Sequence, residues 1–165
     1  MKKAILMMAA LVAVTFSAQA QKKSKEEQAA EKAKKEMMTV AMIDRIVPAK
    51  NFQFIPREYM LAQSGTTMIN RYEYTRVRPN SLEVSMTNCQ SVNTNRYEWV
   101  SCEKVKDKYN VKMKAVSDKG ANLDFDFVID AKKGTAQLKV RSNKALVGGA
   151  GGANSITYKG EIREY

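Results

Sequence analysis

The sequence contains no histidine, and cysteine, tryptophan and proline are scarce, with two, one and three residues respectively. Without histidine the chain lacks the side chain that most often acts as a general base and that commonly binds zinc. Two cysteines are too few for a structural zinc site, which takes about four ligands. We therefore predict that the protein has no metal site and no cofactor, and that it is not an enzyme.

The sequence also lacks an apolar run long enough to cross a bilayer. The longest run, Ala4–Phe16, has about 13 residues, whereas a membrane helix needs about 20. It follows Lys2 and Lys3 and precedes Ala18-Gln19-Ala20, which fits the small-residue cleavage site of a secretory signal. We predict a signal peptide at residues 1–20 and a periplasmic or secreted mature chain without a transmembrane segment.

Basic residues outnumber acidic ones: 28 Lys and Arg stand against 17 Asp and Glu, a net charge of +11. Loss of Lys2 and Lys3 with the signal peptide leaves about +9. In an exported protein such an excess favours anionic lipid head groups, cell-wall polymers or acidic proteins over nucleic acid. We expect an anionic envelope polymer or a protein as partner, although the charge can also serve only to keep the surface soluble.

Cys89 and Cys102 bracket the segment that holds the only tryptophan. An even pair of cysteines in an oxidising compartment is more often bridged than free. The 12 residues between them are too many for a Cys-x-x-Cys redox motif, and they suit two paired strands of a hairpin. We predict a disulfide between Cys89 and Cys102, with two partly buried thiols as the alternative.

The pattern of the mature chain changes twice. Residues 21–36 are rich in alanine, glutamate and lysine and favour a charged helical arm. An apolar stripe from Met37 to Val47, closed by Pro48, predicts that the last three helical turns dock on a domain. Beyond Pro48, apolar and polar residues alternate between turn-forming segments, as in antiparallel sheets. We predict one domain at residues 37–165 that is mainly β: an antiparallel meander of about seven strands, forming a curved sheet or a partly closed barrel with an N-terminal helix.

Two segments superficially suggest ligand sites. Asp124, Asp126 and Asp130 alternate with apolar residues, which predicts the solvent face of a strand rather than a catalytic pair or a calcium site. The glycine-rich segment 146–155 lacks the Gly-Lys-Ser/Thr ending of a phosphate loop and leads into a strand instead of a helix. We interpret it as a flexible hairpin tip, and a mobile flap beside a ligand cleft is the alternative.

The remaining candidate site is a group of basic and aromatic residues between the cysteines. Arginine together with aromatic rings is typical of recognition surfaces and of stacking platforms for sugars or bases. We take three residues as candidate ligand-binding residues: Arg96, Tyr97 and Trp99. An earlier strand has a similar composition, with Arg71, Tyr72, Tyr74 and Arg76. The alternative is that the tryptophan and tyrosines fill the core.

Several strand and turn patterns resemble those of the domain of unknown function 4251 family, exported proteins of Gram-negative bacteria. They are NFQFIP, RVRPNSLEV, KKGTAQLKVRSN and SITYKGEI. The resemblance covers roughly residues 37–162, and it extends to the signal peptide and the lysine- and glutamate-rich helix that such proteins typically carry. The chain departs from the family at Met86–Gln90, where a Leu-Pro-Tyr-aromatic-Gly run is frequent. The resemblance implies no established activity.

We expect an exported cell-envelope protein that binds an envelope ligand or a protein partner without catalysis. A periplasmic enzyme acting on polysaccharide or peptide is the alternative. An enzyme requires a cleft in which polar groups of perturbed pKa converge, whereas a binding module requires only an exposed aromatic or basic patch.

Overall fold

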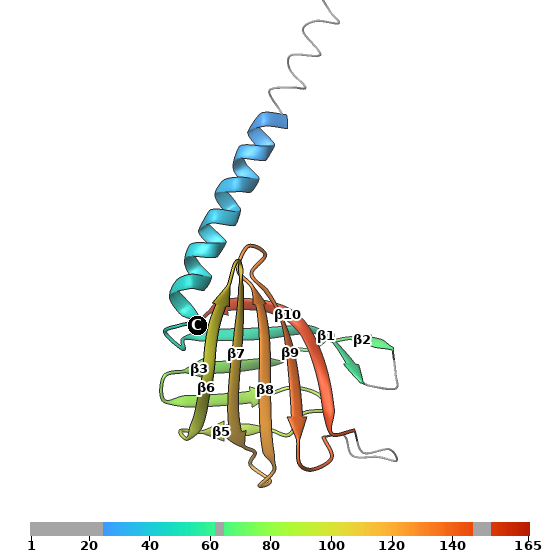
Figure 1. The fold of residues 1–165 in the computed structure, drawn as a ribbon. Coiled ribbons are helices and arrows are strands. Elements are labelled where there is room, and N and C mark those ends of the chain that lie inside the picture. The colour runs from blue at the N-terminus through green and yellow to red at the C-terminus, as the bar shows by residue number, and fades with distance from the viewer. Residues whose placement is uncertain (1–24, 62–64, 147–152) are drawn as a thin grey trace, which may run out of the picture. The chain divides into compact units, whose positions relative to one another are not determined.

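The computed structural model describes residues 25–61, 65–146 and 153–165 (Figure 1). The predicted signal peptide and most of the glycine-rich segment lie outside these ranges. The chain divides into two compact units, Met1–Met38 and Thr39–Tyr165. No helix within the described ranges combines the length and the hydrophobicity that crossing a bilayer requires.

Residues 25–46 are helical, as their alanine, glutamate and lysine content favours. In the second unit, the end of this helix buries Ile43 and Ile46 completely or almost completely, and Val47 follows them into the core. Pro48, which cannot donate a backbone hydrogen bond, stands just after the last turn. Met37, which the predicted apolar stripe included, is instead 73% exposed. The apolar stripe that is buried is therefore shorter than the sequence suggested.

Ten antiparallel strands form one sheet, in the order β5-β4-β3-β1-β10-β9-β8-β7-β6, with β2 paired to β1 beside this path. The strands are β1 (Phe52–Leu61), β2 (Thr66–Met68), β3 (Tyr74–Arg78), β4 (Ser81–Ser85), β5 (Val92–Thr94), β6 (Tyr97–Val105), β7 (Lys108–Val116), β8 (Asn122–Asp130), β9 (Thr135–Ser142) and β10 (Ser155–Glu164). In Figure 1, β6 to β9 stand side by side while β1, β3 and β4 cross them steeply. The sheet is a nearly closed barrel with one seam, between β5 and β6. The prediction of a mainly β, partly closed barrel with an N-terminal helix is confirmed.

Alternating apolar residues line the interior of this barrel. Phe52 and Phe54 of β1 meet Phe127 of β8 edge to face, with ring centroids 5.8 and 5.6 Å apart. Each of these rings is almost fully buried, and burying such a side chain stabilises the fold by about 1.5–3 kcal/mol. The interior contacts therefore hold together strands that lie far apart in the sheet order.

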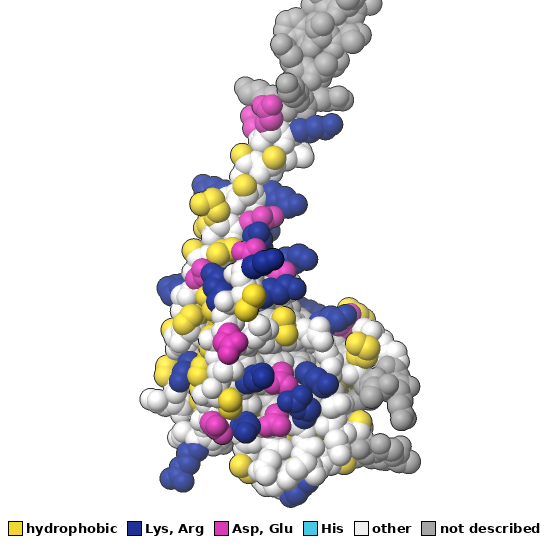
Figure 2. Space-filling model, viewed as in Figure 1, with side chains coloured by type: hydrophobic (Ala, Val, Ile, Leu, Met, Phe, Trp, Pro, Cys, Tyr) yellow, Lys and Arg dark blue, Asp and Glu magenta, His cyan; other side chains and the backbone are white. Residues whose placement is uncertain are grey.

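The outer faces of β7, β8 and β9 carry a ladder of opposite charges. In one row Lys114 lies opposite Asp124, which lies opposite Arg141. A neighbouring row places Asp126 between two lysines, and Arg141 forms an ion pair with Asp126 at 2.7 Å. Figure 2 shows acidic and basic side chains interspersed over this part of the surface. The prediction that the aspartates of β8 lie on an outward strand face is confirmed.

A β-bulge bends β1 where it pairs with β10. Pro56 lies opposite Gly160 and Glu58 opposite Lys159, so Arg57 is the extra residue of the bulge. A Cβ atom at Gly160 would lie 2.1 Å from the carbonyl oxygen of Ile55, so only glycine fits this close approach. The bulge leaves the side chain of Arg57 exposed to solvent.

The predicted disulfide is wrong, because Cys89 and Cys102 are not bonded to each other. The prediction assumed that the strands on either side of the loop pair together. Instead β5 pairs with β4, and β6 pairs with β7, where Cys102 lies opposite Val111. Both cysteines are partly buried against the core. Burial raises the pKa of the Cys89 thiol to about 12 and also raises that of Cys102.

Candidate functional site: an arginine–tyrosine face

The predicted ligand-binding residues lie in different surroundings. Tyr97 packs against the core, and its hydroxyl donates a hydrogen bond to the carbonyl oxygen of Arg78 at 2.6 Å across the seam. Trp99 also packs against the core, with the Lys50 amine 5.2 Å from its ring centroid. Arg96 is exposed and borders, with Tyr97, a hollow of about 860 Å³ that Trp99 does not line. The three side chains do not converge, and their role in ligand binding stays a prediction.

A second group of arginines and tyrosines does gather, on the outer side of β10, β1, β3 and β4. We call it the arginine–tyrosine face, and it consists of Arg57, Tyr72, Tyr74, Arg76, Arg78, Arg163 and Tyr165 with the carboxylates of Glu83 and Glu161. Strand alternation explains its position, since Val77 is buried in the core while its neighbours on β3 point outward.

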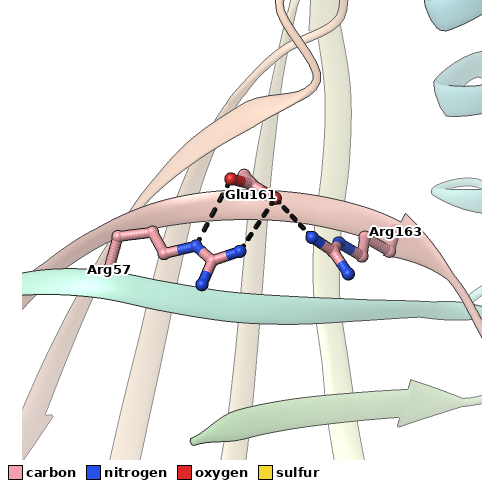
Figure 3. Close-up of polar contacts among 3 residues, drawn as sticks. All are labelled: Arg57, Glu161 and Arg163. Carbon is pink, nitrogen blue, oxygen red and sulfur yellow. Dashed lines mark hydrogen bonds and ion pairs between the residues drawn. The ribbon is translucent and has the colours of Figure 1, made fainter. Parts of the chain in front are cut away.

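One carboxylate of this face is held between two arginines, and we call these residues the Glu161 cluster (Figure 3). Arg57 donates to both carboxylate oxygens of Glu161, at 3.3 and 3.4 Å, and Arg163 donates at 2.9 Å. Hydrogen bonds from Arg163 and then Arg57 lower the pKa of Glu161. The carboxylate is therefore ionised at neutral pH, and the cluster carries one net positive charge. The side chains of Arg57 and Arg163 remain 51% and 56% exposed.

The Glu83 cluster repeats this arrangement on β3 and β4. Glu83 accepts hydrogen bonds from Arg76 at 3.2 Å and from Arg78 at 2.7 Å. Two arginines against one carboxylate again leave one net positive charge. Arg78 keeps 34% of its side chain exposed, whereas Arg76 keeps 22%.

Aromatic rings fix the guanidinium groups of the Glu83 cluster. The Arg76 guanidinium lies 4.0 Å from the ring centroid of Tyr74 and 4.8 Å from that of Tyr165. Arg78 lies 4.4 Å from Tyr165. Burial tends to lower the pKa of Arg76, but hydrogen bonds with Tyr72 and Glu83 outweigh it and raise the pKa. Arg76 is thus a permanently charged, preoriented group.

Tyr72 provides the most open ring of the face, with 65% of the residue exposed. Its hydroxyl accepts a hydrogen bond at 2.8 Å from the side-chain amide of Gln53, a residue that is only 7% exposed. The ring also lies 5.6 Å from that of Tyr74. A ring anchored in this way can contact a ligand at a small cost in conformational entropy.

A third feature, at the other end of β1, is a buried carboxylate that the sequence did not reveal. Glu73 is 3% exposed and borders a hollow of about 340 Å³. It accepts hydrogen bonds from the backbone N–H of Thr87 at 2.8 Å and from the Thr87 hydroxyl, and Arg71 contacts it at 3.1 Å. The Tyr158 hydroxyl donates to the Thr87 carbonyl oxygen at 2.5 Å. These bonds occupy the carboxylate and fasten the segment before β3 to the turn after β4, which is a structural role.

No group of three or more histidine, cysteine, aspartate or glutamate side chains in the described ranges could hold a metal ion. The Glu73 site lies next to Met86–Gln90, and Thr87 and Cys89 belong to that segment.

Comparison with solved structures finds a protein of similar fold. The chain is similar to a DUF4251 family protein from Bacteroides eggerthii, with 12% sequence identity and a TM-score of 0.60 over 77% of this chain and 88% of that chain. This similarity shows a shared fold, and it agrees with the family that the strand patterns suggested. No family model matches the chain, and no curated protein matches it.

Proposed function

We propose that this chain is an exported binding protein of the periplasm or cell exterior, which holds a carboxylated envelope polysaccharide on the arginine–tyrosine face without catalysing a reaction. The observation that carries the proposal is the pair of clusters, around Glu161 and Glu83, in which two arginines share one carboxylate. Both clusters carry excess positive charge, and exposed tyrosine rings lie against the arginines of the Glu83 cluster.

The charge and geometry of the face favour carboxylate groups as ligands. A guanidinium group presents several N–H donors in a plane, and a carboxylate can accept two of them side by side. In each cluster the internal glutamate uses only some of these donors, and the exposed parts of Arg57, Arg78 and Arg163 face solvent. Lysines, by contrast, predominate among the bases on the outer faces of β7 and β9, where aspartates balance them.

The apolar parts of the face favour a sugar polymer over a membrane surface. A protein that lies on a bilayer inserts aliphatic or aromatic side chains into it. The large apolar side chains that this face exposes are the rings of Tyr72 and Tyr165, which are flat and carry hydroxyl groups. The exposed methionines and valines of the described ranges lie on the helix, the far end of β1, β2 and β6 to β8. Tyrosine rings suit contact with the apolar faces of sugar rings.

The state of the carboxylates supports binding over catalysis. A general acid in glycoside cleavage needs a carboxyl group with a raised pKa. Glu161 has the opposite shift, because two arginines stabilise its ionised form. Glu73 is buried but bonded to Thr87 and Arg71, which leaves it poorly placed to act on a substrate.

To test the proposal, the purified mature protein is titrated with polygalacturonate, a carboxylated polysaccharide, and the heat of binding is measured by calorimetry. We expect binding that weakens steeply between 50 and 300 mM salt, because salt screens exposed charges. The variant R57Q/R163Q removes the exposed bases of the Glu161 cluster and should bind roughly tenfold or more weakly. The matched control K112Q/K139Q removes the same charge from the outer faces of β7 and β9 and should bind within about twofold of the parent.

Equal losses of affinity in R57Q/R163Q and K112Q/K139Q would overturn the assignment to this face. Binding would then depend on net charge alone. Tight binding to vesicles of phosphatidylglycerol, with no binding to polygalacturonate, would overturn the choice of a polysaccharide in favour of a membrane. Neutral dextran should not bind.

A further inference from the structure

The strand register places the two arginine clusters in one line across the sheet. Arg163 of β10 lies opposite Gln53 of β1, which lies opposite Arg76 of β3, which lies opposite Glu83 of β4. Neighbouring strands are about 4.8 Å apart, so the backbones of Arg163 and Arg76 are separated by roughly 10 Å. The two positive clusters are therefore neighbours on one surface, although Glu161 and Arg163 come from the last strand of the domain and the Glu83 cluster comes from β3 and β4.

Gln53 and Tyr72 lie between the two clusters. Gln53 stands midway in the row, and its amide donates to the hydroxyl of Tyr72. Tyr72 also accepts a hydrogen bond from Arg76. A ligand that touches both clusters must pass this ring, which is 65% exposed. The row thus presents cation, aromatic ring and cation in succession.

Each cluster taken alone is a weak binding site. Its arginines are already paired with a glutamate, its net charge is one, and exposed ion pairs contribute little in water. When one ligand engages two linked sites, the second contact is intramolecular, and the affinity rises by a factor of about 10² or more. The arrangement therefore gives useful affinity only to a ligand that carries at least two anionic groups on one chain.

We infer that the ligand is an extended polyanion which runs across the strands and engages the Glu161 and Glu83 clusters at the same time, with Tyr72 against a sugar ring between the two engaged carboxylates. This inference rests on the proposed function and specifies the ligand class: a linear chain of acidic sugars, not a single acidic sugar or head group. The direction of the chain is along the row Arg163, Gln53, Arg76, perpendicular to the strands.

Two sets of measurements test this inference, and the first is a length series. The dissociation constant of the full mature protein is measured for galacturonic acid and for its oligomers of increasing length. We expect weak binding of the monomer, a drop of about 10²-fold in the dissociation constant once the oligomer spans both clusters, and a plateau beyond that length. A dissociation constant that falls only in proportion to the number of sugar units would overturn the inference.

The second set combines the length series with one variant in each cluster. R163Q and R78Q each alter one exposed arginine, and K139Q is the control on β9. If one chain spans both clusters, either variant should bind the long oligomer at least tenfold more weakly and the monomer within about twofold of the parent. If a variant loses affinity by the same factor for oligomers of every length, the two clusters act independently and the inference is overturned. Circular dichroism and the urea midpoint show whether each variant is folded.

The outcomes separate the two proposals. If no acidic oligosaccharide binds at any length, the proposed function itself is wrong. If long and short oligomers bind alike, and R57Q/R163Q still weakens binding, the function stands and the bivalent arrangement is wrong. If oligoglutamate of matched charge binds more tightly than the oligosaccharides, the ligand is an acidic peptide and the assignment to a sugar chain is overturned.

Discussion

Arg76 shows what a single side chain does on this surface. Two tyrosine rings, Tyr74 and Tyr165, lie within 5 Å of its guanidinium carbon, and Glu83 holds one of its nitrogens. A lysine could supply the charge but not the plane that stacks on these rings. Its Nε atom is buried and is without a hydrogen-bond partner among the described residues, which indicates that stacking, rather than hydrogen bonding alone, determines its position.

The two cysteines give a prediction at this scale. Because burial raises the pKa of Cys89 to about 12, almost none of its thiol is ionised near neutral pH, and the thiolate is the reactive form. We expect native protein made by export to react slowly with iodoacetamide, and urea-unfolded protein to take up two labels. The urea midpoint should be the same with and without dithiothreitol. Recovery of a Cys89–Cys102 linked peptide from non-reduced exported protein would contradict this expectation.

Among the strands, the β1–β10 pair shapes the arginine–tyrosine face, since its bulge exposes Arg57 beside Glu161. This pairing depends on the missing side chain at Gly160, where a Cβ would lie 2.1 Å from a backbone oxygen. We predict that Gly160→Ala lowers the free energy of unfolding by about 1–3 kcal/mol, because backbone has to move. The control is Gly65→Ala, whose added Cβ meets no atom within 4 Å and should change stability by less than about 0.5 kcal/mol.

Urea denaturation monitored by tryptophan fluorescence measures both variants. A Gly160→Ala protein as stable as the parent would show that β1 and β10 can separate locally without a loss of stability. Weakened polygalacturonate binding in that variant, with the fold retained, would link the bulge to the placement of Arg57.

Seven of the strands could be predicted from alternation, because one face of each is buried and the other is solvated. Three could not. β2 and β5 have three residues each, too short for a pattern. β6 is nine residues long, but a bulge between Trp99 and Ser101 shifts its register, and its position at the seam leaves its inner side chains only partly buried. The wrong disulfide has a different origin, because the prediction paired the strands on either side of the segment between the cysteines, whereas β6 forms a hairpin with β7 across Lys106 and Asp107.

The candidate site could be predicted in part. The arginines and tyrosines of residues 71–76 stand out by composition alone. Arg57, Arg163 and Tyr165 could not be added to them, because the pairing of β1 with β10 and β3 joins segments from the two ends of the domain. Composition also singled out Arg96, Tyr97 and Trp99, but two of these rings lie on the inner side of β6 and pack against the core.

For the whole molecule, the sequence predicts export. The predicted signal peptide lies outside the residues that the structure describes. We expect the exported protein to begin at Gln21, because Ala18 and Ala20 fit the specificity of signal cleavage. Intact-mass measurement of the periplasmic fraction tests this prediction. The control variant Ala20→Arg should accumulate as uncleaved precursor. A mass that includes Met1 in the soluble periplasmic fraction would contradict the prediction.

The pairing of β1 with β10 also has a consequence for newly synthesised chains. β1 is synthesised first and can pair at once with β2 and β3, but its partner along the other edge, β10, is synthesised last. Until residues 155–164 emerge, β1 and β9 each present a row of unpaired backbone groups, which other chains can use as templates for aggregation. We therefore expect chains that end before β10 to aggregate or to be degraded, so a late frameshift that spares every residue before β10 should lower the yield of soluble protein.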